Sequence, residues 1–223
     1  MQDQSMTLEW RDGRVPVSTR FDDPYFSLDD GLAETRHVFL SGNDLPARFA
    51  DGFHVAELGF GTGLNLLATW DAWRRAGAPG RLHFTSFEAY PMGPADMALA
   101  LQAFPEMQAL AAALIDGLSG DGPVYDLGDV TLTVLVGDAR TSLPAWGGRA
   151  DAWFLDGFSP AKNPELWGAD LMAEVGRHTA AAGTVATYTA AGHVRRGLED
   201  AGFNVTRVPG FGRKRHMTRG VKA

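Results

Sequence analysis

Asp156 is an unusual residue to find at the end of an apolar strand. It follows the run DAWFL (151–155) and opens the segment DGFSPAKNPELW (156–167), which is rich in special turn residues. A carboxylate placed there can accept a proton from an amine, orient the nitrogen lone pair and stabilise the positive charge that develops on nitrogen. Gly157 adds no side chain, and Phe158 offers a π face. These residues predict a site at which an amine reacts; capping of the turn by Asp156 is the alternative.

A glycine-rich turn lies earlier in the chain, in ELGFGTGLN (57–65). Its glycines, Gly59, Gly61 and Gly63, follow a predicted strand. Such a turn lets a ligand approach the backbone N–H groups at a helix N-terminus. The spacing is G-x-G-x-G and not the dinucleotide pattern G-x-G-x-x-G. Glu57 would repel a pyrophosphate but suits a cationic ligand such as S-adenosylmethionine, which carries an ammonium and a sulfonium. A tight turn that binds nothing is the alternative.

Two further carboxylates end predicted strands. Glu88 ends SFE, about one strand–helix–strand unit after the glycines, where it can accept both hydroxyls of a ribose. Asp138 ends the next strand, in GDAR, and can accept the adenine amino group. Each acid alone is more often a helix cap or a surface residue. Three acids at successive strand ends behind a glycine-rich turn favour ligand binding instead.

Alternating strands and helices must position these residues. Strands are predicted over 54–58, 81–88, 131–138, 151–156, 183–189 and 203–208, with a final edge strand over 213–220. Helices are predicted over 62–76, 95–118 (broken near 104–105), 164–178 and 190–202. This alternation predicts an α/β fold with a Rossmann-like, doubly wound and mostly parallel sheet. The turns that follow the strands then meet at one edge, where ligands of such sheets bind.

Residues 1–52 are predicted to form an N-terminal extension and lid, and residues 53–223 one compact unit. The extension holds a hairpin that turns at Asp12-Gly13 and a loop over 21–27. A helix is expected to start at Asn43 or Asp44, with Pro46 in its first turn.

Composition excludes several kinds of protein. The 223 residues include no cysteine, so there is no disulfide, catalytic thiol or thiolate metal site. The six histidines show no pair at metal-ligand spacing, and we expect no metal. No apolar run approaches the roughly 18 residues of a membrane span, and the N-terminus does not resemble a signal peptide. A cytoplasmic protein without a membrane partner is expected.

Charge is unevenly distributed along the chain. Of 20 Lys and Arg residues, nine lie from Arg177 onward, whereas only two of the 27 acidic residues do. The net charge of −7 therefore combines an acidic body with a basic final quarter. This asymmetry is compatible with a basic patch that binds nucleic acid, and equally with a solvated basic tail.

Four stretches together resemble the MnmC-type tRNA wobble-uridine methyltransferases. They are ELGFGTGLN, WFLDGFSPAKNPELW, FDDPYFS with GLAETRHVFLSGNDL, and the ending GFGRKRHMTRG. The resemblance runs from about Trp10 to Gly220 and implies a class I S-adenosylmethionine-dependent methyltransferase fold. It also implies methylation of 5-aminomethyl-(2-thio)uridine to the 5-methylaminomethyl form in tRNA.

The resemblance implies a role for each matching residue. Cofactor contacts would come from Glu57, Gly59, Gly61, Gly63, Glu88, Asp138 and Asn43, and the acceptor amine would be held by Asp156. Tyr25 and Phe26 would close over the cofactor and the target base, where aromatic rings suit a flipped uridine; plugging the core is the alternative. On the basic end, anticodon-arm phosphates would be contacted by Arg195, Arg196, Arg213, Lys214 and Arg215.

Two features depart from the family's pattern. The two-enzyme form carries an FAD-dependent oxidase after the methyltransferase, but this chain shows no second glycine-rich dinucleotide motif. We expect no FAD in this chain, and a separate or formerly fused oxidase as a partner. KRHM (214–217) also lacks the more usual acidic residue at its third position, which leaves His216 without an assigned role.

Two other functions remain open from the sequence. A small-amine N-methyltransferase or aminopropyltransferase could use the same fold, although a small amine needs no phosphate contacts from a basic end. A binding module without activity could also retain the fold. In that case the four acids at strand ends would have no purpose.

Overall fold

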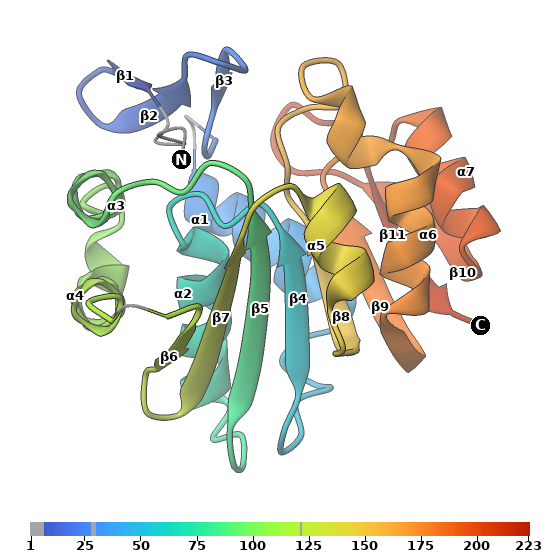
Figure 1. Cartoon of the computed structure of the whole chain (residues 1–223), viewed down its shortest axis with the longest axis horizontal. Helices are drawn as coiled ribbons and strands as arrows, with labels where there is room; N and C mark the ends of the chain where they lie inside the picture. Colours follow the sequence, from blue (N-terminus) through green and yellow to red (C-terminus); the bar gives the residue numbers. More distant parts are fainter. Residues whose placement is uncertain (1–6, 28–29, 121) are drawn as a thin grey trace.

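Eight strands form one sheet within the residues that the computed structural model describes, which are 7–27, 30–120 and 122–223. They are β4 (His54–Leu58), β5 (Leu82–Glu88), β6 (Val124–Asp126), β7 (Val130–Val136), β8 (Ala150–Leu155), β9 (Thr179–Thr187), β10 (Phe203–Pro209) and β11 (His216–Lys222). Their order across the sheet is β10-β11-β9-β8-β4-β5-β7-β6 (Figure 1). The five strands from β9 to β7 in this order pair in parallel, and the pairings of β6, β10 and β11 are antiparallel. The predicted doubly wound, mostly parallel sheet is therefore confirmed.

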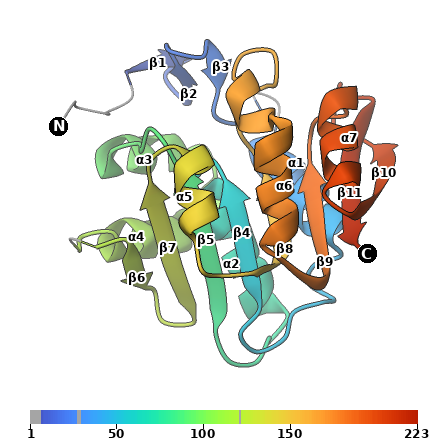
Figure 2. The same ribbon diagram turned by 45° about the vertical axis from the view of Figure 1, so that its right-hand side comes forward.

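Helices cover both faces of the sheet (Figure 2). They are α1 (Gly31–Thr35), the π-helix η1 (Arg36–Leu40), η2 (Ser41–Asn43), α2 (Leu64–Arg75), α3 (Pro94–Leu101), η3 (Pro105–Met107), α4 (Gln108–Gly117), α5 (Ala139–Ala145), η4 (Pro164–Trp167), α6 (Ala169–Arg177) and α7 (Gly192–Asp200). No helix in the described parts of the chain is long and apolar enough to cross a membrane.

Strand alternation divides the interior into two cores. Phe154 packs with Phe39 of η1 on one face, whereas its neighbour Trp153 packs on the other face with residues of α5, α6 and α7. Successive side chains of a strand point to opposite faces, so a strand that is apolar at every position can serve both cores. This explains the continuous apolar run AWFL at the end of β8.

A small antiparallel sheet lies over the carboxyl ends of the central strands (Figures 1 and 2). It consists of β1 (Leu8–Arg11), β2 (Val15–Ser18) and β3 (Asp23–Pro24). Asp12 and Gly13 adopt positive φ, at 53° and 66°, at the centre of a turn in which the Arg14 N–H donates to the Arg11 carbonyl (3.1 Å). The predicted hairpin is confirmed, and β3 adds a short strand within the predicted loop.

The prediction that a helix starts at Asn43 or Asp44 is wrong. Helical structure begins earlier, at Gly31, where the Asp30 side chain accepts a hydrogen bond from the backbone N–H of Ala33 (2.8 Å). Asp44 follows the helical segment in the left-handed conformation, with φ 55°. The polar residues before Pro46 therefore mark where a helix ends and not where one begins.

Two further differences concern α5 and the last strand. The sequence pattern does not predict α5, because this helix has only seven residues and contains Pro144. The strand predicted over 213–220 begins at His216, and it is not an edge strand. β11 is inserted between β9 and β10, where Met217, Thr218 and Gly220 are buried. A short hairpin loop brings it back beside β10, which then forms the edge.

Phe154 offers a test of the core. Its ring stacks on Phe39 (centroids 5.3 Å apart) and meets Phe84 edge-on (6.1 Å). We expect Phe154→Ala to lower the free energy of unfolding by about 3–5 kcal/mol, because it leaves a cavity between helix and sheet. Val124→Ala, at a side chain that is 58% exposed, should change stability by less than about 0.5 kcal/mol. Urea denaturation measures both, and equal losses would contradict the assigned packing.

Candidate active site

The glycine-rich turn and Asp156 meet at the centre of the sheet edge. They follow β4 and β8, which are adjacent and parallel, with Leu58 beside Leu155. The chain continues from β4 toward β5 and from β8 toward β9, on opposite sides. This switch point is where doubly wound sheets bind ligands. The two residues that the sequence placed in separate motifs therefore lie in one site.

The contact between these two turns requires a glycine. The Asp156 backbone N–H donates to the Leu58 carbonyl (3.1 Å). Gly59 has φ +94°, and a Cβ there would lie 2.9 Å from the Asp156 carbonyl oxygen. Any larger residue would push the two strand ends apart, so Gly59 fixes where Asp156 stands.

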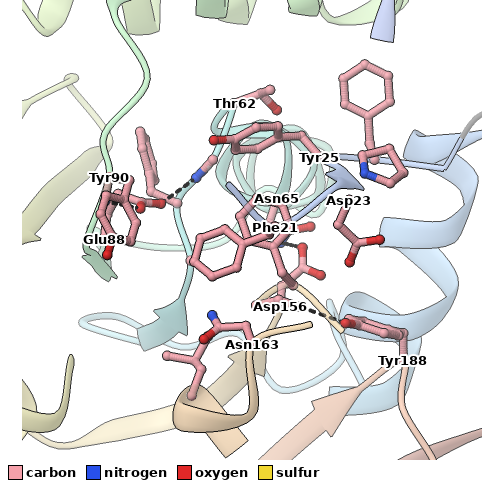
Figure 3. Close-up of a pocket in the computed structure, with 18 of the residues that line it drawn as sticks. Phe21, Asp23, Tyr25, Thr62, Asn65, Glu88, Tyr90, Asp156, Asn163 and Tyr188 are labelled. Carbon is pink, nitrogen blue, oxygen red and sulfur yellow. Dashed lines mark hydrogen bonds between the residues drawn. The ribbon is translucent and has the colours of Figure 1, made fainter. Parts of the chain in front are cut away.

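A cavity of about 450 Å³ opens at this point. Most of the predicted site residues line it: Tyr25, Phe26, Gly59, Gly61, Glu88, Asp138, Asp156, Phe158 and Lys214. Figure 3 shows side chains from the N-terminal extension and from the strand ends converging on the same space. The structure thus brings together residues that are up to 189 positions apart in the chain, from Tyr25 to Lys214.

Glu88 holds the glycine-rich turn in place. Its carboxylate accepts hydrogen bonds from the backbone N–H of Gly61 (3.0 Å) and of Tyr90 (2.7 Å). The side chain is largely buried, with the residue 8% exposed, yet it lines the cavity. Each oxygen keeps a further lone pair for a ligand.

Asp138 combines two roles at the start of α5. It caps the helix by accepting from the Arg140 backbone N–H (2.9 Å). It also forms an ion pair with the Arg140 guanidinium (2.6 Å). The hydrogen bonds from Arg140 hold the pKa of Asp138 below its usual range. Asp138 therefore both caps α5 and lines the cavity.

Three predicted cofactor residues are not among those that line the cavity. Glu57 is fully buried, and it accepts hydrogen bonds from Ser86 (2.7 Å) and Asn65 (2.8 Å). Gly63, with φ +80°, faces Leu114, which a Cβ would approach within 2.8 Å. Both residues therefore contact the protein interior next to the turn and support its conformation.

Asn43 also lies away from the cavity, within the core. Its side chain donates to the carbonyl oxygen of Phe39 (2.9 Å) and accepts from the Thr184 hydroxyl (2.6 Å). It is fully buried. The prediction that Asn43 contacts the cofactor is therefore corrected: its place ties η1 and η2 to β9.

Asp156 carries an unusual proton affinity. Burial raises its pKa to about 7, although a hydrogen bond from Asn65 Nδ2 (2.7 Å) opposes the rise. Glu34 raises the pKa further, and Lys214 lowers it. A carboxylate with a pKa near neutrality can both accept and release a proton at physiological pH.

The loop after Asp156 is held by three side chains. Tyr188 donates its hydroxyl to the Gly157 carbonyl (2.7 Å), and the Trp167 indole donates to the Phe158 carbonyl (2.8 Å). Asp23, from the extension, accepts from the Ser159 backbone N–H (2.9 Å). The extension therefore helps to hold the loop that carries Phe158.

Aromatic rings gather on one wall of the cavity. Phe21 stacks on Phe158 (4.8 Å between centroids, 27° between planes), and Tyr25 meets Phe158 edge-on (5.1 Å). The Tyr25 hydroxyl is buried without a hydrogen-bond partner among the described residues. Phe26 also lines the cavity, but its ring packs against Phe104 of the core (5.0 Å between centroids). It therefore belongs partly to the core, which was the alternative to binding the target base.

The basic residues of the C-terminal quarter divide into two groups. Lys214 lines the cavity, where it pairs with Glu34 and lies over the Tyr188 ring (4.5 Å). The prediction that it binds phosphate is not supported by these partners. Arg213 and Arg215 are exposed beside it on the β10–β11 loop. On α7, Arg196 is exposed, but Arg195 is half-buried, and its Nε has no hydrogen-bond partner in the part of the chain that the structure describes.

Several cavity residues escaped sequence reasoning. Asn65 lies in the glycine-rich motif and Asp23 in FDDPYFS, so the signal for each is a motif that points to the site. Glu34 and Tyr188 lie in no turn pattern that points to chemistry. Only the folding of α1 and β9 against the switch point brings them to the cavity.

Comparisons with known proteins agree with this geometry. A family model described as S-adenosyl-L-methionine-dependent methyltransferase matches residues 107–223. The tRNA 5-methylaminomethyl-2-thiouridine biosynthesis bifunctional protein MnmC of Stutzerimonas stutzeri is 47% identical over 97% of the chain. The protein of that name from Caulobacter vibrioides is 50% identical over 93%. The chain spans only 34% and 36% of the lengths of these relatives.

Solved structures show the same fold. The crystal structure of MNMC2 from Aquifex aeolicus superposes with a TM-score of 0.77 at 26% identity, covering 98% of this chain and 71% of that one. A putative class I methyltransferase from Listeria monocytogenes is 13% identical with a TM-score of 0.53, over 93% of this chain and 62% of that one. The family model covers more than half of the chain, and the central sheet has the class I arrangement. The protein belongs to the S-adenosyl-L-methionine-dependent methyltransferase family.

Proposed function

We propose that the protein methylates the amine of 5-aminomethyl-(2-thio)uridine at the wobble position of tRNA, giving the 5-methylaminomethyl form. The observation that carries this proposal is the placement of Asp156 beside the glycine-rich turn in one cavity. Relatives at 47% and 50% identity, named for tRNA 5-methylaminomethyl-2-thiouridine biosynthesis, support the choice of substrate.

The cavity fits S-adenosylmethionine. Gly59 and Gly61 leave backbone exposed to it, and Glu88 offers carboxylate lone pairs to a ribose. Asp138 lines the same cavity at the next strand end. The buried, unpartnered Tyr25 hydroxyl is a donor that a ligand would satisfy, since buried polar groups rarely lack a partner. Bound there, S-adenosylmethionine supplies a methyl group attached to a sulfonium.

Asp156 performs the proton chemistry in this proposal. The substrate amine must lose a proton before its lone pair can form a bond to carbon. One carboxylate oxygen, Oδ2, is bonded to Asn65, and Oδ1 has no donor among the described residues. Oδ1 is therefore free to accept a proton from the amine and to align its lone pair. Asp156 passes that proton on to solvent, and the restored carboxylate stabilises the positive charge that develops on nitrogen.

The aromatic wall suits a flipped base. Phe158, held between Phe21 and Tyr25, gives a planar apolar surface next to Asp156. A base that leaves the anticodon stack loses stacking energy, which a ring in the pocket can restore. The wall explains how a uracil ring could be held with its aminomethyl group toward the carboxylate.

The charges on the cavity's rim suit a tRNA backbone. Arg213 and Arg215 flank Lys214, which reaches the cavity, and Arg196 is exposed on α7. Carboxylates lie inside the cavity, where the amine would enter. This arrangement would attract phosphates to the rim and a cation to the interior.

The proposal also includes an oxidase that acts on the tRNA before the methylation step. The relatives are named bifunctional, and this chain spans about a third of their length. We propose that the chain itself uses no FAD, and that an FAD-dependent oxidase, separate or fused, releases the aminomethyl group that this site methylates.

The reaction is tested by mass spectrometry of nucleosides. Undermodified tRNA that carries 5-aminomethyl-(2-thio)uridine is incubated with the protein and S-adenosylmethionine labelled in its methyl group. We expect the aminomethyl nucleoside to gain one labelled methyl. Free small amines, offered in parallel, should remain unmethylated and receive no aminopropyl group. Labelling of those amines and not of tRNA would replace this proposal with the small-amine alternative.

Asp156→Asn separates proton transfer from binding. The amide keeps the size of the side chain and can still accept from Asn65, but it cannot take a proton from the amine. Turnover should fall by roughly 10²–10⁴-fold, the range for loss of a positioned proton acceptor. Calorimetric affinity for S-adenosylmethionine should stay near that of the wild type. Higher pH should restore part of the rate, because more of the amine is then neutral.

Thermal stability gives the folding control for this variant. The folded protein holds the Asp156 proton more tightly than the unfolded chain does, since its pKa rises from 3.8 to about 7. This residue therefore reduces stability as pH rises through that window. Asp156→Asn should melt above the wild type at pH 8, and the difference should shrink at pH 4. Near-normal turnover in a well-folded variant would make Asp156 a loop cap only.

Paired arginine variants test the tRNA surface. Arg213→Gln with Arg215→Gln should weaken tRNA binding and flatten its dependence on salt by about 0.7–0.9 log units per lost phosphate contact. Affinity for S-adenosylmethionine should not change. The control is Arg75→Gln, because Arg75 is also exposed but ends α2 and does not line the cavity. An unchanged salt slope in the double variant would make these arginines ordinary surface residues.

A further inference from the structure

We propose that Asn65 is a positioning residue, whose single side-chain amide holds the Asp156 carboxylate in place and keeps it ionised for the reaction. This role rests on the function proposed above. It gives a task to the last residue of the glycine-rich motif, for which the sequence offered none.

The amide of Asn65 joins two buried side chains, those of Glu57 and Thr35, to Asp156 at the cavity. Its Nδ2 donates to Asp156 Oδ2 (2.7 Å) and to Glu57 Oε1 (2.8 Å). Its Oδ1 accepts from the Thr35 hydroxyl (2.9 Å). An amide nitrogen has two hydrogens, so each carboxylate receives one of them. Asn65 itself is 5% exposed and lies in the first turn of α2.

Thr35 determines which way this amide faces. If the amide were turned over, its oxygen would face two carboxylates and its nitrogen would face the hydroxyl. That arrangement would lose both hydrogen bonds to carboxylate and bring like partial charges together. The three contacts therefore fix the orientation of the Asn65 amide, and this in turn fixes the position of Asp156 Oδ2.

Glu57 is the second carboxylate that accepts a hydrogen bond from the Asn65 amide. It is fully buried, and burial raises its pKa well above the usual value despite hydrogen bonds from Ser86 and Asn65. The Asp156 charge raises it further. Two carboxylates thus share one amide, and the one without access to the cavity keeps its proton more readily. Asp156, which lines the cavity, is the one that ionises to accept a proton.

Other charges around Asp156 do not replace the amide. The titratable groups that face it are Glu57 on β4, Glu34 on α1, Asp23 on β3, Tyr188 after β9 and Lys214 on the β10–β11 loop. Lys214 is the only cation in this set, and it is paired with Glu34. The hydrogen bond from Asn65 is the larger of the two influences that lower the Asp156 pKa.

The pH dependence of turnover tests this role. Turnover should rise with pH as Asp156 ionises, and Asn65→Ala should move that rise upward by about one pH unit, the effect of losing one charge-assisted hydrogen bond. The ionised fraction at pH 7 would fall from about a half to about a tenth, so turnover there should fall about fivefold and largely recover at pH 9, with S-adenosylmethionine affinity unchanged. Thr35→Val, which only frees the amide to turn, should shift the profile in the same direction by less.

Asn43→Ala is the matched control. Asn43 is equally buried and hydrogen-bonded but lies away from the cavity. This variant should lower the melting temperature and leave the acid limb of the pH profile at its wild-type position. A wild-type limb in Asn65→Ala would overturn the proposal. If Asn65→Ala does not fold, a wild-type limb in folded Thr35→Val overturns it instead.

A carboxyl titration separates this inference from the proposed function. Carbon-13 NMR follows the Asp156 carboxyl, assigned by its loss in Asp156→Asn, and needs no turnover. The titration midpoint should also move upward by about one pH unit in Asn65→Ala. A wild-type protein that does not methylate tRNA would reject the proposed function, whereas an unmoved midpoint would reject the role of Asn65.

Discussion

The close approach of two strand ends governs the whole site. At Gly59 the glycine-rich turn comes so near the backbone of Asp156 that a Cβ would lie 2.9 Å from its carbonyl oxygen. The sheet order places β4 beside β8, and their parallel register brings both turns to the same level. A cofactor that reaches the exposed backbone after β4 would therefore lie within reach of the carboxylate after β8. The distance between donor and acceptor groups is set by the sheet and not by a flexible loop.

Charge is arranged in layers around this contact. Glu57, the most deeply buried acid of the site, is surrounded by hydrogen-bond donors and lies behind the glycines. Asp156 lines the cavity, and Arg213 and Arg215 lie outside it on an exposed loop. A cation and a polyanion would thus be drawn to different depths of the same opening. Lys214 lies between the layers and is paired with Glu34, so it balances the acids of the interior instead of extending the basic rim.

Sequence patterns predicted the frame of the site better than its lining. Apolar strands and glycine turns are local signals, and they placed Glu88, Asp138 and Asp156 at strand ends correctly. The positions of the four acids in the sequence do not show which of them line the cavity. Glu57 is one position short of the strand end, and the two-residue period of a strand turns it into the interior. Asn43 and Lys214 found partners in distant segments, Thr184 and Glu34, which no local pattern could have indicated.

The burial of two carboxylates shows where stability and function oppose each other. An isolated buried charge is costly, and a fold selected for stability alone would place apolar residues at both positions. Thr35 instead orients the Asn65 amide, and the carboxylates accept hydrogen bonds from Ser86 and Asn65; the three residues belong to different elements. These neutral donors reduce the cost of burial without introducing a cation that would hold Asp156 permanently ionised. A carboxylate kept near its neutral point can take a proton from an amine and give it up again, and the network around Asn65 is what maintains that balance.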